Sequence, residues 1–144
     1  MKMTVYLIQS PEDWQKALQI RKQVFVVEQK VDEKEEFDEF EEISRHFIAK
    51  ISDQAVGTAR WRYTEKGIKL ERFAVSADAR GKGVGQELVK TILQDVDNQA
   101  ESKGKLCYLH GQITAVYLYE KFGFQKVGDI FDECGILHYK MIRK

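Results

Sequence analysis

The stretch of sequence that decides the fold is VSADARGKGVG, residues 75–85. It joins a segment with a strand pattern to a long amphipathic segment with a helix pattern. Three alternating glycines let the backbone turn tightly and bring its N–H groups close to a ligand. The following helix points the positive end of its dipole at the same place, and Arg80 and Lys82 add charge. We therefore expect Arg80–Gly85 to bind an anion, and a phosphate group is the expected ligand.

Three nucleotide-binding motifs also use glycine-rich loops, and each of them fails here. The dinucleotide fingerprint needs a glycine where Gln86 stands, and a Walker A loop needs Gly-Lys-Ser/Thr after a four-residue gap. A kinase glycine loop lies in a hairpin and needs partner motifs that a chain of 144 residues cannot hold. The plain structural alternative is a tight strand-to-helix turn that uses glycine for its geometry alone.

The hydrophobic pattern on either side of this loop predicts a mixed sheet. A first strand is expected within Met1–Gln9, and a helix begins at Pro11 with Ser10 as its N-cap. Further helices are expected at Gln86–Ser102 and Thr114–Phe122. The remaining strands are expected at His46–Ile51, Ala55–Tyr63, Gly67–Val75, Lys105–His110, Phe124–Phe131 and Ile136–Ile142. This order predicts an α/β fold with helices on the faces of a mixed sheet, rather than a regular βαβ repeat.

Composition narrows the class of protein. The length suits a single domain over residues 1–144, and the formal net charge of zero argues against a general nucleic-acid binder. No apolar run is long enough for a membrane span, and the N-terminal apolar stretch is too short for a signal peptide, so we expect a cytoplasmic protein. The histidines are dispersed, and Cys107 and Cys134 have no metal-ligand spacing, so no metal site is expected. Both cysteines are expected to be packing residues.

The loop has the form Arg-x-x-Gly-x-Gly over Arg80–Gly85, and it resembles the coenzyme A loop of the GNAT acetyltransferase superfamily. Thr114–Phe124, with its Gly123-Phe124 ending, resembles the second signature of that superfamily. Arg21–Gln29 and Phe131–Met141 are similar to its small bacterial YjcF- or ElaA-like branch. The resemblance implies a single GNAT domain over residues 1–144, with a mostly antiparallel central sheet and helices on both faces.

The resemblance also implies the reaction. Members of this superfamily transfer an acetyl group from acetyl-CoA, as co-substrate, to a primary amine by direct attack in a ternary complex without a metal. The acceptor would be a small molecule or a peptide, and the protein a monomer or homodimer. Positions that match the coenzyme-binding residues are Phe73, Ala74, Val75, Arg80, Gly81, Lys82, Gly83, Val84, Gly85 and Gln86.

Tyr119 stands where the resemblance places the general acid that protonates the departing thiolate. A phenol of pKa near ~10 can protonate a thiolate of slightly lower basicity at modest cost. The alternative is a core tyrosine on an amphipathic helix. Tyr117 lies on another face of the same helix and is the lesser candidate.

The general base is assigned to Glu71, on the strand beside the transfer point. Regular alternation would put Glu71 on the same face as Phe73 and Val75. Glu28, His110 and a water relay remain open as alternatives, and each of these side chains also has a purely structural interpretation.

An acidic stretch covers Glu28–Glu42, where nine acids and two lysines give a local charge of −7. The segment is expected to form a short helix with loops, in the region that walls the acceptor site in relatives. One hypothesis is that it favours a cationic acceptor, and the alternative is a solvated charged face.

Two other functions compete with catalysis. A coenzyme A-binding sensor that has lost activity would keep the same loop, although Tyr119 favours an enzyme. An acyl-phosphate or nucleotide-binding module is the third reading, and the failed nucleotide motifs count against it.

Overall fold

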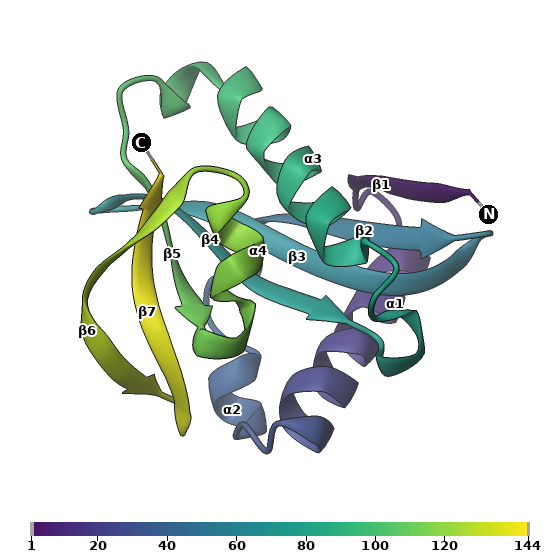
Figure 1. Ribbon diagram of the computed structural model, residues 1–144. Coiled ribbons are helices and arrows are strands. Elements are labelled where there is room, and N and C mark those ends of the chain that lie inside the picture. Colours follow the sequence, from purple (N-terminus) through teal and green to yellow (C-terminus); the bar gives the residue numbers. More distant parts are fainter. Residues whose placement is uncertain (1, 144) are drawn as a thin grey trace.

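A central sheet of seven strands organises the molecule in the computed structural model, which describes residues 2–143 (Figure 1). The strand order is β1-β2-β3-β4-β5-β7-β6, and β4–β5 is parallel whereas the other pairs are antiparallel. The strands are β1 (Met3–Leu7), β2 (Arg45–Ile51), β3 (Gln54–Thr64), β4 (Gly67–Val75), β5 (Cys107–Gln112), β6 (Phe124–Glu133) and β7 (Ile136–Arg143). The predicted mixed, mostly antiparallel sheet is confirmed.

The first helix, α1 (Pro11–Arg21), begins as the sequence predicts. The Ser10 hydroxyl accepts a hydrogen bond from the backbone N–H of Asp13 at 3.1 Å, and Pro11 occupies the first turn. The helix continues into a wider π-helical segment, Lys22–Glu28, which the sequence pattern did not distinguish from α-helix. The acidic stretch that follows contains the short helix α2 (Glu33–Glu36), as expected.

Two further helices follow the glycine loop and β5. The helix expected at 86–102 is α3 (Val84–Asn98), followed by a 3₁₀ turn at Ala100–Ser102. The helix expected at 114–122 is shorter, because Ile113–Ala115 forms a 3₁₀ turn before α4 (Val116–Glu120). None of the helices within residues 2–143 is long and apolar enough to cross a bilayer.

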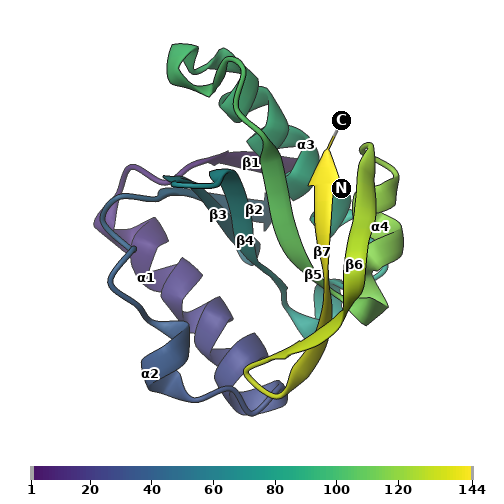
Figure 2. The same ribbon diagram turned by 90° about the vertical axis from the view of Figure 1, so that its left-hand side faces the viewer.

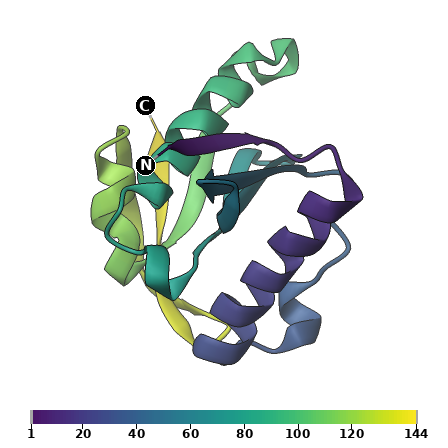
Figure 3. The same ribbon diagram turned by 90° about the vertical axis from the view of Figure 1, so that its right-hand side faces the viewer.

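The helices cover opposite faces of the sheet, with α1 and α2 on one face and α3 and α4 on the other (Figures 2 and 3). The larger core lies under α3 and α4, and a smaller one joins α1 and the π-helical segment to Ala74 of β4. At Gly57 on β3 a Cβ atom would lie 2.8 Å from Val84 Cγ1, so α3 packs directly on the strand backbone. This packing fixes the start of α3, and with it the glycine loop, against the middle of the sheet.

Candidate active site

A gap opens in the middle of the sheet, where β4 and β5 separate. The two strands pair only from Ile68–Cys107 to Leu70–Leu109, whereas β4 continues to Val75 and β5 to Gln112. A cavity of about 140 Å³ lies at this point. Because the sheet is open there, residues from both of its faces line one cavity. They include Leu70, Glu71, Arg72 and Phe73 of β4, His110 of β5, Tyr119 of α4 and Glu133 of β6.

A β-bulge in β4 changes which side chains face each layer. Thr58 pairs with Ala74 but Arg60 pairs with Glu71, so one residue of β3 stands opposite both Arg72 and Phe73. Arg72 takes a left-handed backbone conformation with φ of 63°. Phe73 therefore packs against the core under α3, whereas the Glu71 side chain bonds Arg60 on the α1 side. The expectation that Glu71 shares a face with Phe73 is wrong, because the bulge breaks the alternation.

The glycine loop has the geometry that the sequence predicts. Gly81 and Gly83 have φ of 82° and 86°, and a Cβ atom at either would meet no heavy atom within 4 Å. These glycines therefore serve the backbone conformation and not close packing. The first backbone bond of α3 runs from the N–H of Glu87 to the carbonyl of Gly83 at 3.1 Å. The N–H groups of the preceding residues point out of the helix start, as an anion site requires.

Arg80 has partners of its own at this loop. Its Nε donates to the carbonyl oxygen of Val75 at 3.0 Å, and its Nη2 lies 2.6 Å from Glu28 Oε1. The guanidinium thus links the end of β4 to the π-helical segment. Glu28, one of the alternative bases, is occupied by this pair and does not line the cavity.

Tyr119 enters the cavity from α4. The residue is 6% exposed, and no side-chain hydrogen bond of its hydroxyl is found within residues 2–143. Its ring meets Phe73 edge to face at 5.5 Å, and a Cβ atom on Gly111 would lie 3.3 Å from its Cδ2. Burial raises the pKa of Tyr119, so the phenol stays protonated at neutral pH. Tyr117, the lesser candidate, is 65% exposed and lies away from the cavity.

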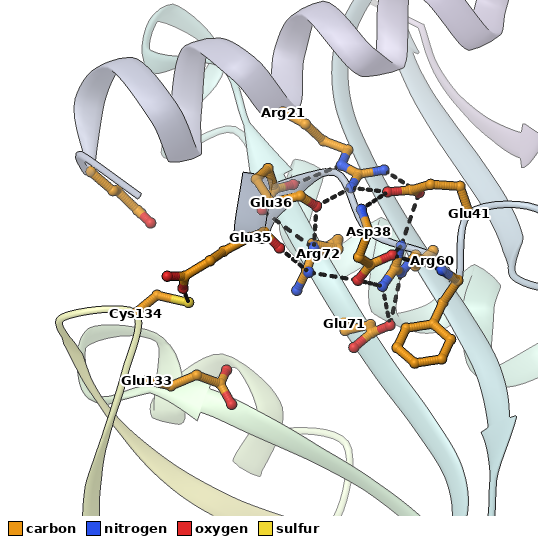
Figure 4. Close-up of polar contacts among 12 residues, drawn as sticks. Arg21, Glu35, Glu36, Asp38, Glu41, Arg60, Glu71, Arg72, Glu133 and Cys134 are labelled. Atoms are coloured by element: carbon orange, nitrogen blue, oxygen red, sulfur yellow. Dashed lines mark hydrogen bonds and ion pairs between the residues drawn. The ribbon is translucent and has the colours of Figure 1, made fainter. Parts of the chain in front are cut away.

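A buried ionic network forms the wall of the cavity on the α1 side (Figure 4). Three arginines meet four carboxylates there, namely Arg21, Arg60 and Arg72 with Glu36, Asp38, Glu41 and Glu71. Arg21 donates Nε to Glu36 at 2.8 Å and both terminal nitrogens to Glu41 at 2.8 Å. Arg60, which is fully buried, donates to Glu41 at 2.9 Å and to Asp38 at 2.7 Å.

This network changes the interpretation of the acidic stretch. Glu36 is 3% exposed, and four of the nine acids, Glu28, Glu36, Asp38 and Glu41, are bound to arginines. The acidic stretch is therefore not a charged face that is solvated along its whole length. Arg72 adds a direct link from the bulge to α2, because its Nε and Nη2 donate to the carbonyl oxygens of Glu36 and Glu35 at 3.3 Å.

Glu71 is held within the same network. Burial disfavours its ionised form, but Arg60, Arg62 and Lys69 outweigh burial and lower the pKa of Glu71 to about 2. Its Oε2 accepts from Arg60 Nε at 2.8 Å and from Arg62 Nε at 2.7 Å. A carboxylate with so low a pKa is a weak acceptor for a proton from an amine. That Glu71 is the general base stays a prediction, and these contacts favour a role in positioning the network.

The end of the β6–β7 hairpin brings a second group of titratable side chains to the cavity. Glu133 Oε1 lies 2.9 Å from His110 Nδ1, and Oε2 lies 3.8 Å from His138 Nε2. His138 Nδ1 in turn lies 2.8 Å from the carbonyl oxygen of Ile136. The Phe131 ring meets His110 edge to face at 5.1 Å and stacks on His138 at 5.9 Å. The bond from His110 lowers the pKa of Glu133 more than burial raises it.

The two cysteines lie in different surroundings. Cys107 is buried in the larger core, as expected of a packing residue. Cys134 corrects the expectation, because it is exposed at the β6–β7 turn with φ of 54°, and its thiol donates to Glu35 Oε2 at 2.6 Å. Burial raises the pKa of Cys107 to about 12, and burial and then the bond to Glu35 raise that of Cys134 to about 11. Neither thiol is activated as a nucleophile.

Sequence reasoning missed several residues of this site. Glu133 and His138 carried no assigned role, and they reach the cavity only because β6 and β7 pair as a hairpin. Arg21 could have been noticed in the sequence, because it is the polar exception on an otherwise apolar helical stripe. In the structure its guanidinium is bound by two carboxylates, Glu36 and Glu41. Within residues 2–143 no group of three or more histidine, cysteine or acidic side chains is arranged to hold a metal ion.

The split between β4 and β5, the glycine loop at the start of α3 and the buried Tyr119 in the cavity fit an acyl-CoA-dependent acetyltransferase. The family model for the acetyltransferase (GNAT) domain matches residues 10–144, and the chain belongs to that family. The resemblance in the sequence is thereby confirmed.

Similar proteins agree with this assignment. The chain is 36% identical to the uncharacterized protein YyaT of Bacillus subtilis strain 168, over 99% of this chain and 96% of the relative. It is 32% identical to the uncharacterized N-acetyltransferase YjcF of the same strain, over 98% and 99% of the two chains. The crystal structure of Escherichia coli ElaA matches all of both chains with a TM-score of 0.81 and 26% identity. The likeness to the YjcF- and ElaA-like branch is confirmed.

Proposed function

We propose that this protein transfers the acetyl group of acetyl-CoA to a primary amine of a small molecule or peptide, by direct attack in a ternary complex. The observation that carries the proposal is the gap between β4 and β5, because it exposes one cavity to groups from both faces of the sheet. Two substrates can then meet from opposite sides, which in-line transfer requires.

The coenzyme is assigned to the side of the sheet that α3 and α4 cover. The unpaired edge of β4 at Phe73, Ala74 and Val75 suits an extended pantetheine arm, and the N–H groups from Lys82 to Gln86 suit its pyrophosphate. Bound acetyl-CoA supplies the acetyl group as a thioester. A backbone N–H at the bulge would donate to the thioester oxygen as negative charge develops on it.

Tyr119 is assigned as the general acid. Its hydroxyl has no partner among residues 2–143, and the ring lies beside Phe73 at the point where the strands part. Burial raises the pKa of the phenol, and the same apolar surroundings raise the proton affinity of a thiolate that leaves next to it.

The acceptor is assigned to the side of the sheet that α1 and α2 cover. Glu35 of α2 and Glu133 of β6 both line the cavity, and neither is paired with a lysine or arginine in the described part of the chain. Their charge supports a cationic acceptor such as a polyamine, an aminoglycoside or a lysine-bearing peptide.

The location of the protein in the cytoplasm and its assembly as a monomer or homodimer stay predictions.

The test is an acetylation assay with purified protein, acetyl-CoA and a panel of primary amines that differ in charge, followed through thiol release. We expect turnover, with cationic amines preferred. Binding of acetyl-CoA without turnover on every amine would support a coenzyme A sensor instead, and a preference for neutral or acidic amines would remove the idea of a cationic acceptor.

A further inference from the structure

The reaction requires a group that removes a proton from the attacking amine, and the cavity offers a limited set of candidates. An unbound primary alkylamine is protonated at neutral pH, with a pKa near ~10.4 as in lysine, and only its neutral form attacks. The base must line the cavity, have an unoccupied lone pair and lie on the acceptor side of the sheet. This inference rests on the proposed function.

Most carboxylates of the cavity fail these conditions. Glu36 and Glu71 are each bound by two or more cationic side chains. Glu35 is exposed to solvent, and its Oε2 already accepts the Cys134 thiol at 2.6 Å. His138 is buried, and its Nε2 lies beside Glu133, which already bonds another imidazole.

His110 satisfies all three conditions. It is the residue of β5 directly after the last pair with β4, so it stands at the edge of the gap. Its Nδ1 is engaged by Glu133 at 2.9 Å, which makes Nδ1 the protonated nitrogen and leaves Nε2 with the lone pair. Nε2 has no partner among residues 2–143, and the side chain is 25% exposed, so the ring is accessible to a substrate.

The faces of the sheet separate this imidazole from the acid. His110 and Tyr108 are alternate residues of β5 and therefore face the same side of the sheet. The Tyr108 hydroxyl hydrogen-bonds Thr64, which lies on the side of β3 that carries Arg60. His110, which pairs in register with Lys140, thus faces the α1 side. Tyr119 approaches from the other face through Gly111. A nucleophile that attacks a carbonyl from one side, while the leaving group departs on the other, needs its base and acid on opposite sides. The gap provides this arrangement.

We propose that His110, oriented by Glu133, is the general base for the acceptor amine. His110 Nε2 takes one proton from the bound ammonium group, and the neutral amine that remains attacks the thioester carbon. As the C–N bond forms and the C–S bond breaks, the Tyr119 hydroxyl gives one proton to the departing sulfur, and the resulting phenolate takes the second proton that the nitrogen loses. The products are an N-acetyl amide, a thiol, an imidazolium and the regenerated phenol. The imidazolium then loses its proton to solvent. Glu133 is a positioning residue, since it fixes the tautomer and stabilises the imidazolium.

The charges around His110 define its pH response. Glu133 of β6 faces it directly, His138 and Lys140 of β7 flank it, and Lys69 of β4, which pairs with Tyr108, also lines the cavity. A base must be unprotonated to act, so kcat/KM should fall as pH is lowered. This fall at low pH is the acidic limb of the pH profile of kcat/KM, and it should be absent from a variant that lacks His110.

The experiment compares His110→Gln and Glu133→Gln with Glu101→Gln, an exposed carboxylate-to-amide change on the 3₁₀ turn after α3. Spermidine and phenethylamine serve as alkylamine probes, together with any better amine from the panel, and 4-methoxyaniline serves as an amine that is neutral at assay pH. We expect kcat/KM for the alkylamine to fall about 100-fold in His110→Gln and about tenfold in Glu133→Gln, and to stay within twofold in Glu101→Gln. Aniline turnover should fall less, because no ammonium proton has to be removed.

Three readouts keep the outcomes distinct. Binding of acetyl-CoA by each variant shows that the fold and the coenzyme site are intact. The imidazole nitrogen NMR spectrum of the wild-type protein should show His110 protonated at Nδ1 and not at Nε2. If amines are acetylated and His110→Gln keeps both its rate and its acidic limb, the base assignment is overturned while the proposed function stands. If acetyl-CoA binds but no amine is acetylated, the proposed function fails and this inference with it.

Discussion

The rings of Phe73 and Tyr119 meet edge to face at 5.5 Å across the gap between β4 and β5. Phe73 reaches this place because the bulge at Arg72 turns it toward α4, and Tyr119 reaches it because Gly111 has no side chain. The contact joins the strand assigned to the pantetheine arm to the helix that carries the assigned acid. It therefore holds the phenol beside the strand edge to which the proposal assigns the pantetheine arm.

Tyr119→Phe should lower kcat by 10- to 1,000-fold and leave the Kd for acetyl-CoA within about twofold, because only the proton donor is removed. Tyr117→Phe is the matched control, since Tyr117 belongs to the same helix and is 65% exposed. Steady-state kinetics and calorimetric titration measure both effects. Unchanged turnover in Tyr119→Phe would remove the assigned acid.

Gly83→Ala should weaken coenzyme binding. A left-handed φ costs a residue with a Cβ atom roughly 1–2 kcal/mol, so the loop is expected to relax and displace its N–H groups. Gly104→Ala is the control, because Gly104 has φ of 78° and, like Gly83, open space at its Cβ position, but lies beyond α3. Both variants should lose similar stability, and only Gly83→Ala should bind acetyl-CoA less tightly. Equal affinity in the two variants would contradict the role of the loop.

Arg60→Met should destabilise the fold by about 3–5 kcal/mol, because it leaves Asp38, Glu41 and Glu71 without their buried partner. Arg143→Met removes a longer and more exposed ion pair, at 3.4 Å from Asp97, and should cost less than about 1 kcal/mol. Urea unfolding at pH 7 gives both values. A small effect at Arg60 would show that the network adds little to stability.

The folded state should lose stability in acid. The folded-state pKa of Glu71 and of Asp38 is lowered to about 2, chiefly by arginines that overcome burial. A lowered pKa stabilises the fold above the unfolded-state value near ~4, and this stabilisation is lost as pH falls from there toward 2. For Glu71 the loss is on the order of 3 kcal/mol.

Burial raises the pKa of Glu36, and this works in the opposite direction and partly offsets the loss. Urea midpoints measured between pH 7 and pH 2.5 test the prediction. Arg60→Met should show a shallower dependence on pH, since the charge that lowers both values is gone. An equally steep dependence in that variant would assign the acid sensitivity to other groups.

Local sequence patterns predicted the parts of this protein that depend on neighbouring residues. The glycines of Arg80–Gly85, the Ser10 cap and the amphipathic pattern of α3 are local signals, and each predicted its element. The position of Tyr119 in the gap followed from a resemblance in its signature, and the cavity agrees with it.

The predictions that failed concern features that depend on long-range pairing or on a single added residue. Alternation placed Glu71 wrongly because a bulge leaves no clear trace in composition. The carboxylate partners of Arg21 and Arg60 come from a distant acidic stretch, and charge counting alone could not pair them. The contact of Glu133 with His110 needs the whole β5-β7-β6 arrangement.

The bulge at Arg72 reverses the alternation of side chains between the two faces of β4. Before it, one set of alternate side chains of β4 faces the α1 side of the sheet, and after it the opposite set does. A single strand can thus present a carboxylate to one compartment and, two residues later, an aromatic ring to the other. Deletion of this one residue would restore regular pairing and turn Phe73 away from Tyr119, so the partition of the site into two compartments depends on the length of the strand as much as on its composition.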